Sequence, residues 1–126
     1  MAQGLTLDAG AITAYEKRDR RMWALFKAAI ENNATISVAT AVVAQVHRGN
    51  SPLVSRMLSA CDIETLTLER AQRAGLLLAA SQTSDIADAI VVAGAAARSD
   101  AILTSDREDI ERLVAAARID LPIVAV

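Results

Sequence analysis

The sequence predicts a three-layer α/β fold, in which a five-stranded parallel β-sheet is covered by helices on both faces. Short stretches rich in β-branched and aliphatic residues alternate along the chain with longer stretches of helical periodicity, a pattern typical of α/β folds. These short stretches are too apolar for one side to face water, which favours a parallel sheet. The length of 126 residues is that of one domain, so we expect a single domain spanning residues 1–126.

The first half of the chain is predicted to contain three strands and three helices. Asp19 is a suitable N-cap for the first helix, in which apolar residues recur at helical spacing. Ser51 followed by Pro52 gives a later helix a cap and a first-turn proline, and Gly49 is expected to end the helix before it. In chain order the elements are strand Leu5–Asp8, helix Asp19–Asn32, strand Thr35–Val38, a helix capped by Thr40 that runs to His47, a helix from Ser51, and strand Asp62–Leu66.

The second half is predicted to alternate helices and strands. Its second helix is almost entirely apolar with an alanine-rich middle, which indicates burial on several sides. Ser105 and Glu108 have the spacing of a capping box at the start of the last helix. In chain order the elements are helices Thr67–Ala80 and Ser84–Arg98, strand Ala101–Thr104, helix Asp106–Ala117 and strand Leu121–Val126.

Composition and charge limit how the protein could bind nucleic acid. The chain is 53% hydrophobic and 22% charged, a mixture typical of a globular domain. Its net charge of −2 has the wrong sign for holding nucleic acid by overall electrostatics, and its aromatic content of 2% offers few surfaces for base stacking. Binding would therefore be local, through bound cations or through the basic residues at 17–21, which are more simply explained as a solvated helix entrance.

Several site types and locations are disfavoured. Cys61 and His47 are single residues of their kind without any zinc-ligand spacing, and both are interpreted as structural. The N-terminus has no basic region followed by an apolar signal core. The longest apolar stretch, Ile86–Ala97, is interrupted by Asp88 and falls short of the ~20 residues that span a membrane. We expect a cytoplasmic protein without a membrane segment.

Four aspartates are expected to converge at the carboxyl edge of the sheet. Asp8 ends the first strand and Asp106 follows the fourth, and ligands of open parallel sheets bind at this edge. Asp85 and Asp88 lie three apart at the start of the helix that leads into the fourth strand, so the start of that helix reaches the same edge. The small residues after Asp8 are expected to leave its carboxylate uncovered.

Each of these acids also has a structural explanation. Asp85 and Asp88 could stabilise a helix N-terminus by about 0.3–1 kcal/mol, although this explanation is weaker for Asp88 on an apolar face. The remaining acids are interpreted as solvated charges, chiefly Asp19, Glu64, Glu69, Asp109 and Glu111.

Grouped carboxylates favour a divalent metal ion. Two unit charges ~6 Å apart repel by roughly 3 kcal/mol at an effective dielectric near 20, and a cation removes this repulsion. A site made of oxygen ligands suits Mg²⁺ or Mn²⁺. In a hydrolytic site without a paired histidine, such an ion can supply the nucleophile from water.

Four motifs follow one another along the chain: LTLDAGAI at Leu5–Ile12, VVAQVHRG at Val42–Gly49, TSDIADA at Thr83–Ala89 and LTSD at Leu103–Asp106. This ordered set resembles PIN-domain proteins, and within them the ribonuclease toxins of type II toxin–antitoxin pairs, the VapC-like group. The resemblance covers nearly the whole chain, and the set is specific although each motif alone is weak.

The resemblance implies strand order 3-2-1-4-5 and an acidic pocket that binds Mg²⁺ or Mn²⁺ and cleaves RNA. It also implies a homodimer held inactive by a cognate antitoxin protein. Carried over by motif position, Asp8, Asp88 and Asp106 are the catalytic and metal-binding acids, and Asp85 is an additional or alternative ligand. Thr104 and Ser105 are supporting polar neighbours. The candidates for contacting the RNA backbone are Arg18, Arg21, Arg48 and Arg107.

One position departs from the family pattern, because Gln45 stands where the family usually has glutamate. An amide oxygen can still hold a metal or a water, but the site loses one charge, for which Asp85 is expected to compensate in part. The alternative is a catalytically weak PIN domain that acts mainly as a protein- or RNA-binding module. Two other families with a strand-end aspartate are disfavoured: haloacid-dehalogenase enzymes need an acid where Gly10 stands, and response-regulator receivers need an N-terminal acidic pair.

Overall fold

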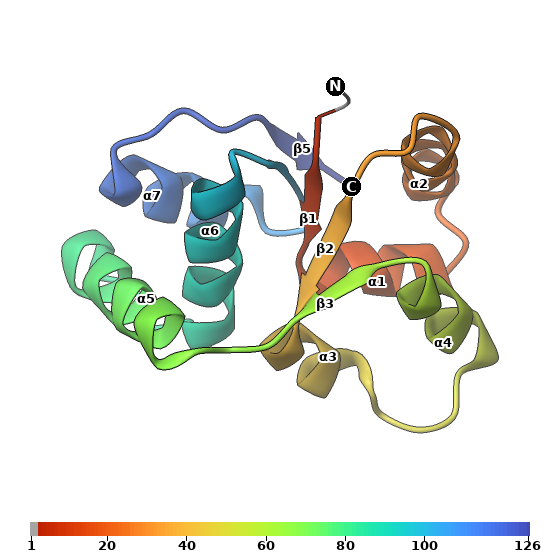
Figure 1. Cartoon of the computed structure of the whole chain (residues 1–126), viewed down its shortest axis with the longest axis horizontal. Coiled ribbons are helices and arrows are strands. Elements are labelled where there is room, and N and C mark those ends of the chain that lie inside the picture. The colour runs from red at the N-terminus through yellow and green to blue at the C-terminus, as the bar shows by residue number, and fades with distance from the viewer. Residues whose placement is uncertain (1–2) are drawn as a thin grey trace.

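The computed structural model describes residues 3–126, which form five strands and seven helices. The described elements are arranged as one sheet between two groups of helices (Figure 1). In chain order they are β1 (Leu5–Leu7), α1 (Ala9–Glu16), α2 (Arg20–Glu31), β2 (Ile36–Ala39), α3 (Thr40–Val46), α4 (Pro52–Ser59), β3 (Asp62–Glu64), α5 (Leu68–Ser81), α6 (Ile86–Arg98), β4 (Ala101–Thr104), α7 (Arg107–Ala117) and β5 (Ile123–Ala125).

The sheet has the order β3-β2-β1-β4-β5, and every neighbouring pair of strands is parallel. The predicted five-stranded parallel sheet is therefore confirmed, including its strand order. β1 is the central strand, and Leu5 is in register with both Ile36 of β2 and Ala101 of β4. Because β1 and β4 are neighbours and parallel, the residues that follow them emerge at the same edge.

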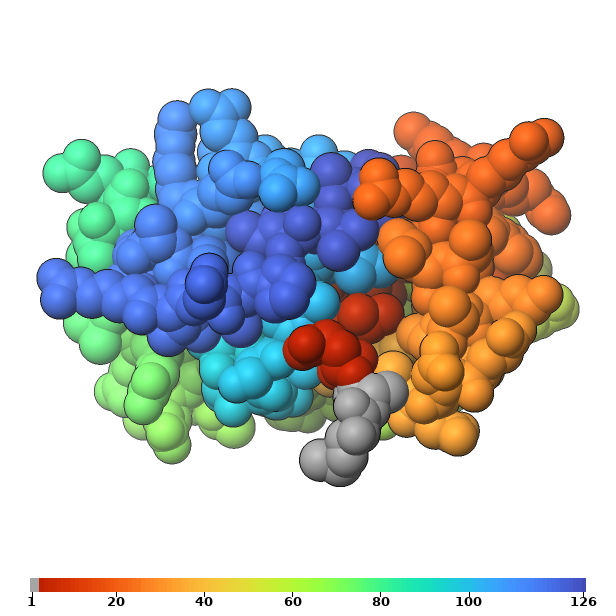
Figure 2. Space-filling model, turned by 90° about the horizontal axis from the view of Figure 1, so that it is seen from above, coloured from red at the N-terminus to blue at the C-terminus, as the bar shows by residue number. Residues whose placement is uncertain are grey.

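The helices cover both faces of the sheet, as predicted. Helices α5, α6 and α7 lie on one side, and α1, α2 and α4 lie on the other (Figure 1). Figure 2 looks onto the opposite edge, where the strands begin, and shows the first residues of β1 (red) between the orange segment that contains α2 and the blue C-terminal segment.

The core is aliphatic, and α6 is its most buried helix. Seven consecutive residues of α6, from Ala89 to Ala95, are buried, which confirms the interpretation of its alanine-rich middle. Leu7 of β1 and Leu103 of β4 are almost wholly inaccessible. Within residues 3–126, no single helix is long and apolar enough to cross a membrane, although α5 and α6 together, bent by 111°, meet that test by length and composition alone.

The sequence analysis missed one helix, α1, which follows β1 directly. Asp8 is its N-cap, and the Asp8 carboxylate accepts the backbone N–H of Ala11 at 2.8 Å. The first turn consists of alanine and glycine, so it carries no amphipathic pattern that would mark a helix. Further along, the indole N–H of Trp23 donates to the backbone oxygen of Tyr15 at 2.8 Å, and the two rings stack. This contact joins α1 to α2.

Two predicted N-caps are confirmed, namely Asp19 and Ser51. Two other predictions about helix ends are wrong. Thr40 is the first residue of α3 and not its cap, since the N-cap is Ala39. The capping box of Ser105 and Glu108 does not form, because the N-cap of α7 is Asp106 and Glu108 reaches Arg112 instead at 3.5 Å.

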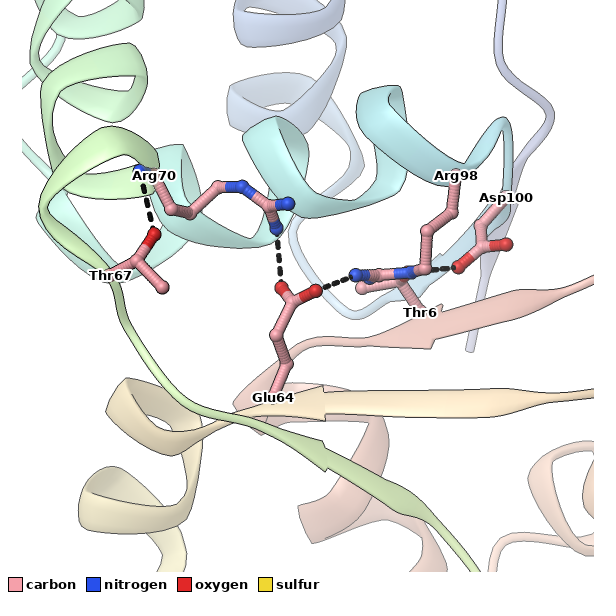
Figure 3. A network of polar contacts seen from close by, with 6 residues as sticks. All are labelled: Thr6, Glu64, Thr67, Arg70, Arg98 and Asp100. Carbon is pink, nitrogen blue, oxygen red and sulfur yellow. Dashed lines mark hydrogen bonds and ion pairs between the residues drawn. The ribbon is translucent and has the colours of Figure 1, made fainter.

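Glu64 is part of a partly buried network of polar side chains, which corrects its interpretation as a solvated charge (Figure 3). Its carboxylate pairs with the guanidinium groups of both Arg70 and Arg98. Arg98 also donates to the carboxylate of Asp100 at 2.9 Å and to the hydroxyl of Thr6 at 2.9 Å. Thr6 in turn donates to Asp100 at 2.7 Å. The network ties α5 and the end of α6 to β1 and β3.

Candidate active site

Three carboxylates meet where α6 and α7 begin. Oxygen atoms of Asp88, Asp106 and Asp109, one from each residue, all lie within 4.8 Å of one another. Asp88 belongs to the first turn of α6, Asp106 is the N-cap of α7, and Asp109 belongs to the first turn of α7. The predicted convergence of Asp88 and Asp106 is therefore present. Asp109 is an addition, since the sequence analysis interpreted it as a solvated charge.

Asp8 lies beneath this cluster and is not one of its three members. Its side chain is buried, with 4% of the residue exposed, so the expectation of an uncovered carboxylate is wrong. The cause is α1, whose N-terminus the carboxylate caps through the Ala11 amide. Asp8 is still near enough for its charge to act on Asp88, whose pKa it raises after the larger effects of burial and of Asp85.

Thr104, the last residue of β4, connects Asp8 to the cluster. Its hydroxyl donates to the Asp8 carboxylate and accepts the backbone N–H of Asp106 at 2.8 Å. Thr104 is fully buried, so no water competes for either hydrogen bond. The predicted supporting role of Thr104 thus has a geometric basis, because one hydroxyl fixes the positions of two of the predicted acids.

Ser105 is held against α1 rather than capping α7. A Cβ atom added to Gly10 would lie 1.6 Å from the Ser105 hydroxyl oxygen and 2.6 Å from its Cβ. The absence of a side chain at position 10 therefore lets the turn between β4 and α7 lie directly on the first turn of α1. This close approach sets the position of Asp106, the next residue.

Asp85 is explained by helix capping. It is the N-cap of α6, and its carboxylate accepts the backbone N–H of Asp88 at 2.9 Å. It is exposed and does not belong to the group of three oxygens within 4.8 Å. Its charge nevertheless contributes to the site, since it raises the pKa of Asp88.

The electrostatics of the cluster reflect this crowding of like charges. Burial, followed by the charges of Asp85, Asp8, Asp106 and Asp109, raises the pKa of Asp88 to about 7. Burial raises the pKa of Asp106 as well, followed by a hydrogen bond and the charge of Asp109. Burial and neighbouring negative charges both disfavour the ionised form of a carboxyl group, which is why the pKa of Asp88 lies so far above its ordinary value.

Burial also raises the pKa of Asp8, and three hydrogen bonds oppose this effect. The bonds come from the Thr104 hydroxyl and from the backbone N–H groups of Ala11 and Ser105. Hydrogen bonds to a carboxylate favour its charged form. Asp8 is therefore a buried acid whose neighbours are arranged to hold a negative charge.

The predicted polar and basic residues lie in several places. Gln45 and Arg48 line a cavity of about 540 Å³ between α1, α3 and the start of α4, and this lining contains none of the three clustered acids. Asp88 and Asp109 line a different cavity of about 360 Å³, together with Asp85 and Arg112. The sequence analysis did not consider Arg112, because nothing in its spacing distinguishes it from other surface arginines.

The remaining arginine candidates are on the surface. Arg107 is exposed and pairs with Glu111 at 2.7 Å within α7. Arg18 and Arg21 are exposed at the junction of α1 and α2. Of the four candidates, Arg107 is the nearest in sequence to the acidic cluster, since it follows Asp106 directly.

The donor set of the cluster fits a hard divalent cation. It consists of carboxylate oxygens from three residues, with no thiolate or imidazole, and such sets prefer Mg²⁺ or Mn²⁺ over zinc. A cation would also relieve the repulsion that raises the pKa values of Asp88 and Asp106.

Comparison with known proteins identifies the fold. No protein-family model matches the sequence, and no curated protein matches it either. Among solved structures, a chain of VapBC2 from Rickettsia felis, crystallised bound to a DNA fragment from its promoter, is similar with a TM-score of 0.70 and 16% identity, covering 97% of this chain and 98% of that one. PAE2754 from Pyrobaculum aerophilum is similar with a TM-score of 0.64 and 14% identity, covering 94% of this chain and 100% of that one. These neighbours are PIN domains, so the resemblance found in the sequence is confirmed at the level of the fold.

Proposed function

We propose that this chain is a metal-dependent endoribonuclease, the toxin of a toxin–antitoxin pair, which hydrolyses phosphodiester bonds of RNA with Mg²⁺ or Mn²⁺. The observation that carries the proposal is the group of carboxylate oxygens within 4.8 Å of one another, at the carboxyl edge of a PIN-type sheet. Like charges at that separation repel by about 3 kcal/mol per pair at an effective dielectric near 20. Such a group is unfavourable for stability alone, which supports a role in binding a cation.

Asp88 and Asp106 would hold the ion, with Asp8 as the third predicted acid beneath them. When bound, the ion supplies a nucleophile from water at neutral pH and stabilises the charge that develops on the phosphate. The two oxygens of Asp8 accept three hydrogen bonds from the protein, which leaves one lone pair of the carboxylate for a further partner. Thr104 orients Asp8 and the Asp106 backbone together, so these residues are positioned before any ligand arrives.

The basic residues of the exposed surface would contact the RNA backbone. Arg107 directly follows Asp106, so a strand bound at the acids would pass beside it. Arg48 lines the larger cavity, Arg18 lies in the connection between α1 and α2, and Arg21 lies in the first turn of α2. Phosphate contacts of this kind give affinity without reading sequence. A cognate antitoxin completes the proposal by analogy with VapBC2, and a homodimer is carried over from the resemblance found in the sequence.

A second candidate function is that of a protein- or RNA-binding module with weak catalysis. The observation in its favour is that Gln45 is uncharged, and that the cavity it lines contains none of the clustered acids. In that case the acidic cluster would be a remnant of a nuclease site, and the cavity between α1, α3 and α4 would be the functional surface.

A nuclease assay with matched variants separates the two functions. Asp106→Asn is the better test variant, since Asp106 is exposed, whereas Asp8 is buried and caps α1. Glu108→Gln is the control, because it removes the same charge from the same helical turn at an exposed residue. Structured RNA labelled at one end is incubated with the full chain and Mn²⁺ or Mg²⁺, with EDTA as the metal-free control.

The nuclease proposal predicts metal-dependent cleavage by the wild type and by Glu108→Gln, and a loss on the order of a hundredfold or more in Asp106→Asn. Equal cleavage by Asp106→Asn would contradict it. Tight RNA binding without cleavage under either metal would favour the binding module.

A further inference from the structure

We propose that the cavity between α1, α3 and α4 is a specificity subsite, which binds one unpaired base of the RNA substrate and fits adenine best. The cavity measures about 540 Å³. Pockets that bind small ligands typically measure about 300–1,000 Å³, so the cavity has room for one nucleotide unit. The inference rests on the proposed function, since it gives the nuclease a means of choosing its substrate.

The cavity begins beside the acidic site. Ala9 and Gly10 form part of its wall, and they directly follow Asp8. Gly10 also lies against Ser105, the residue before Asp106, because a Cβ at position 10 would fall 1.6 Å from the Ser105 hydroxyl oxygen. The first turn of α1 is therefore shared by the cavity and the acidic site. An RNA strand with one phosphate at the acids would bring a neighbouring base to the cavity.

The lining combines apolar and polar groups in the way that a base requires. A flat ring can pack on the aliphatic side chains of Ile12, Val46 and Val54. The polar groups include the side-chain amides of Gln45 and Asn50. Gln45 accepts the Nε–H of Arg48 through its backbone oxygen at 2.9 Å, which leaves its side-chain amide for another partner. Asn50 is exposed, so its amide is accessible to a ligand as well.

The two amides are the reason for naming adenine. The side chain of asparagine or glutamine forms a bidentate pair with adenine, donating to N7 and accepting from the N6 amino group. A carboxylate accepts hydrogen bonds but donates none, so a glutamate at position 45 would lack the donor for N7. Gln45 departs from the family pattern at this position. The departure replaces a charge with the donor that an adenine contact needs.

The charges of the lining are unsuited to an ion as the occupant. Among the described residues that line the cavity, Arg48 is the one cation and Glu16 is the one acid, so their charges cancel. A base is neutral, and single-stranded RNA is read mainly through unstacked bases. Arg48 can contact a phosphate at the rim while the cavity holds the base. Affinity and base selection would then come from neighbouring groups.

The test is the base preference of the full chain. A pool of single-stranded oligoribonucleotides with randomised sequence is incubated with the protein and Mn²⁺, and sequencing of the cut ends gives relative kcat/KM values for each base beside the cut. Fluorescence anisotropy in EDTA measures binding of oligoadenylate, oligouridylate and oligocytidylate without cleavage.

Three proteins are compared: wild type, Asn50→Asp and Asn33→Asp. Asn50→Asp keeps the shape of the side chain and removes its donor. Asn33→Asp is the matched control, because it adds the same charge at an exposed residue between α2 and β2. A general effect of charge would weaken all substrates alike, whereas a lost donor would weaken adenine selectively. Thermal unfolding checks that each variant is folded.

The wild type is expected to cut beside adenine roughly tenfold faster than beside other bases, the discrimination typical of a bidentate amide contact. Asn50→Asp should lose this preference, and Asn33→Asp should keep it. Cleavage by the wild type without preference for adenine, or an Asn50→Asp protein with the wild-type preference, would overturn the subsite and leave the proposed nuclease intact. The cavity would then suit another occupant, such as a segment of a protein partner.

The binding measurement distinguishes the two proposals if no cleavage occurs. Tighter binding of oligoadenylate that depends on Asn50 would support the subsite in an RNA-binding module and contradict the nuclease. Equal binding of all three oligonucleotides, or none, by a wild type that does not cleave would overturn both proposals.

Discussion

Thr104 at the end of β4 donates a hydrogen bond from its side-chain hydroxyl to the carboxylate of Asp8, the residue that directly follows β1, and both residues are buried. The bond spans two neighbouring strands and joins two motifs that are far apart in the sequence. Because the same hydroxyl accepts the Asp106 amide, a single side chain determines how two acids of the site are placed.

Replacing Thr104 by valine tests this arrangement, since valine has the same shape without the hydroxyl. Asp8 would lose the foremost of the hydrogen bonds that oppose the effect of burial, so its pKa would rise further. The Asp106 amide would lose its acceptor. We expect the free energy of unfolding at pH 7 to fall by about 1–3 kcal/mol, as measured by urea denaturation. Thr104→Ser retains the hydroxyl and should lose only about 0.8 kcal/mol for the methyl group. Equal losses in both variants would show that the hydrogen bonds contribute nothing.

The stability of the metal-free protein should decrease as the pH rises from about 4 to 7. The pKa of Asp88 is about 7 in the folded state, above its ordinary value of 3.8, so the folded state binds this proton more tightly than the unfolded state. This contribution is fully present below the unfolded pKa and is lost as the pH passes the folded pKa. It amounts to at most about 4 kcal/mol, because a shift of one pKa unit corresponds to 1.36 kcal/mol.

Urea denaturation in EDTA across this pH range checks the effect. Asp88→Asn should show a flatter profile than the wild type and higher stability at pH 8. Glu111→Gln, at an exposed residue of α7, should keep the wild-type slope. Parallel profiles for wild type and Asp88→Asn would mean that Asp88 is not the titrating group.

Arg98 should be the most sensitive residue of the polar network in Figure 3. Its removal by Arg98→Ala leaves Asp100, of which only 4% is exposed, without its cationic partner. Such a loss costs about 3 kcal/mol of stability, because a buried charge remains uncompensated. Arg112→Ala breaks an exposed pair and should cost less than about 1 kcal/mol. Similar unfolding free energies for the two variants would contradict the buried character of the network.

The sequence was sufficient to predict the sheet and the edge at which the site forms. Strand spacing and the apolar character of the strands led to a parallel sheet, and the position of acids after strands placed Asp88 and Asp106 together. These inferences succeed because they depend on local pattern and on the geometry common to all parallel sheets.

The burial of Asp8, the pairing of Glu64 and the position of Asp109 could not be predicted. Each depends on tertiary contacts that leave no local signal. Asp8 is covered by α1, a helix whose first turn carries no amphipathic pattern. Glu64 carries the same charge as the solvated acids of the chain, so the sequence does not distinguish it from them. Its contact with Arg98 forms only when α6 packs on the sheet. Asp109 and Glu108 are adjacent acids in the first turn of α7, and nothing in the sequence distinguishes them. Only the direction in which each side chain leaves the helix does so.

Gly10→Ala should disturb the site although alanine favours helices. An added Cβ would lie 1.6 Å from the Ser105 hydroxyl oxygen and 3.3 Å from the Ser105 backbone nitrogen, so the turn that carries Asp106 must move away from α1. Gly75→Ala in α5 is the matched control, because a Cβ there meets no atom within 4 Å. Gly75→Ala should gain about 0.5–1 kcal/mol of stability from helix propensity, whereas Gly10→Ala should lose stability despite the same gain.

The metal site should follow the displacement of Asp106. Gly10→Ala is expected to weaken Mn²⁺ binding, and Gly75→Ala is expected to leave it unchanged. A further substitution, Ser105→Gly, removes both side-chain atoms that the new Cβ would meet, so the double variant should regain part of the lost affinity. Recovery of this kind would separate a steric effect at Ser105 from a general loss of folding. If Gly10→Ala binds Mn²⁺ as tightly as Gly75→Ala, the contact between α1 and the turn after β4 does not set the position of Asp106.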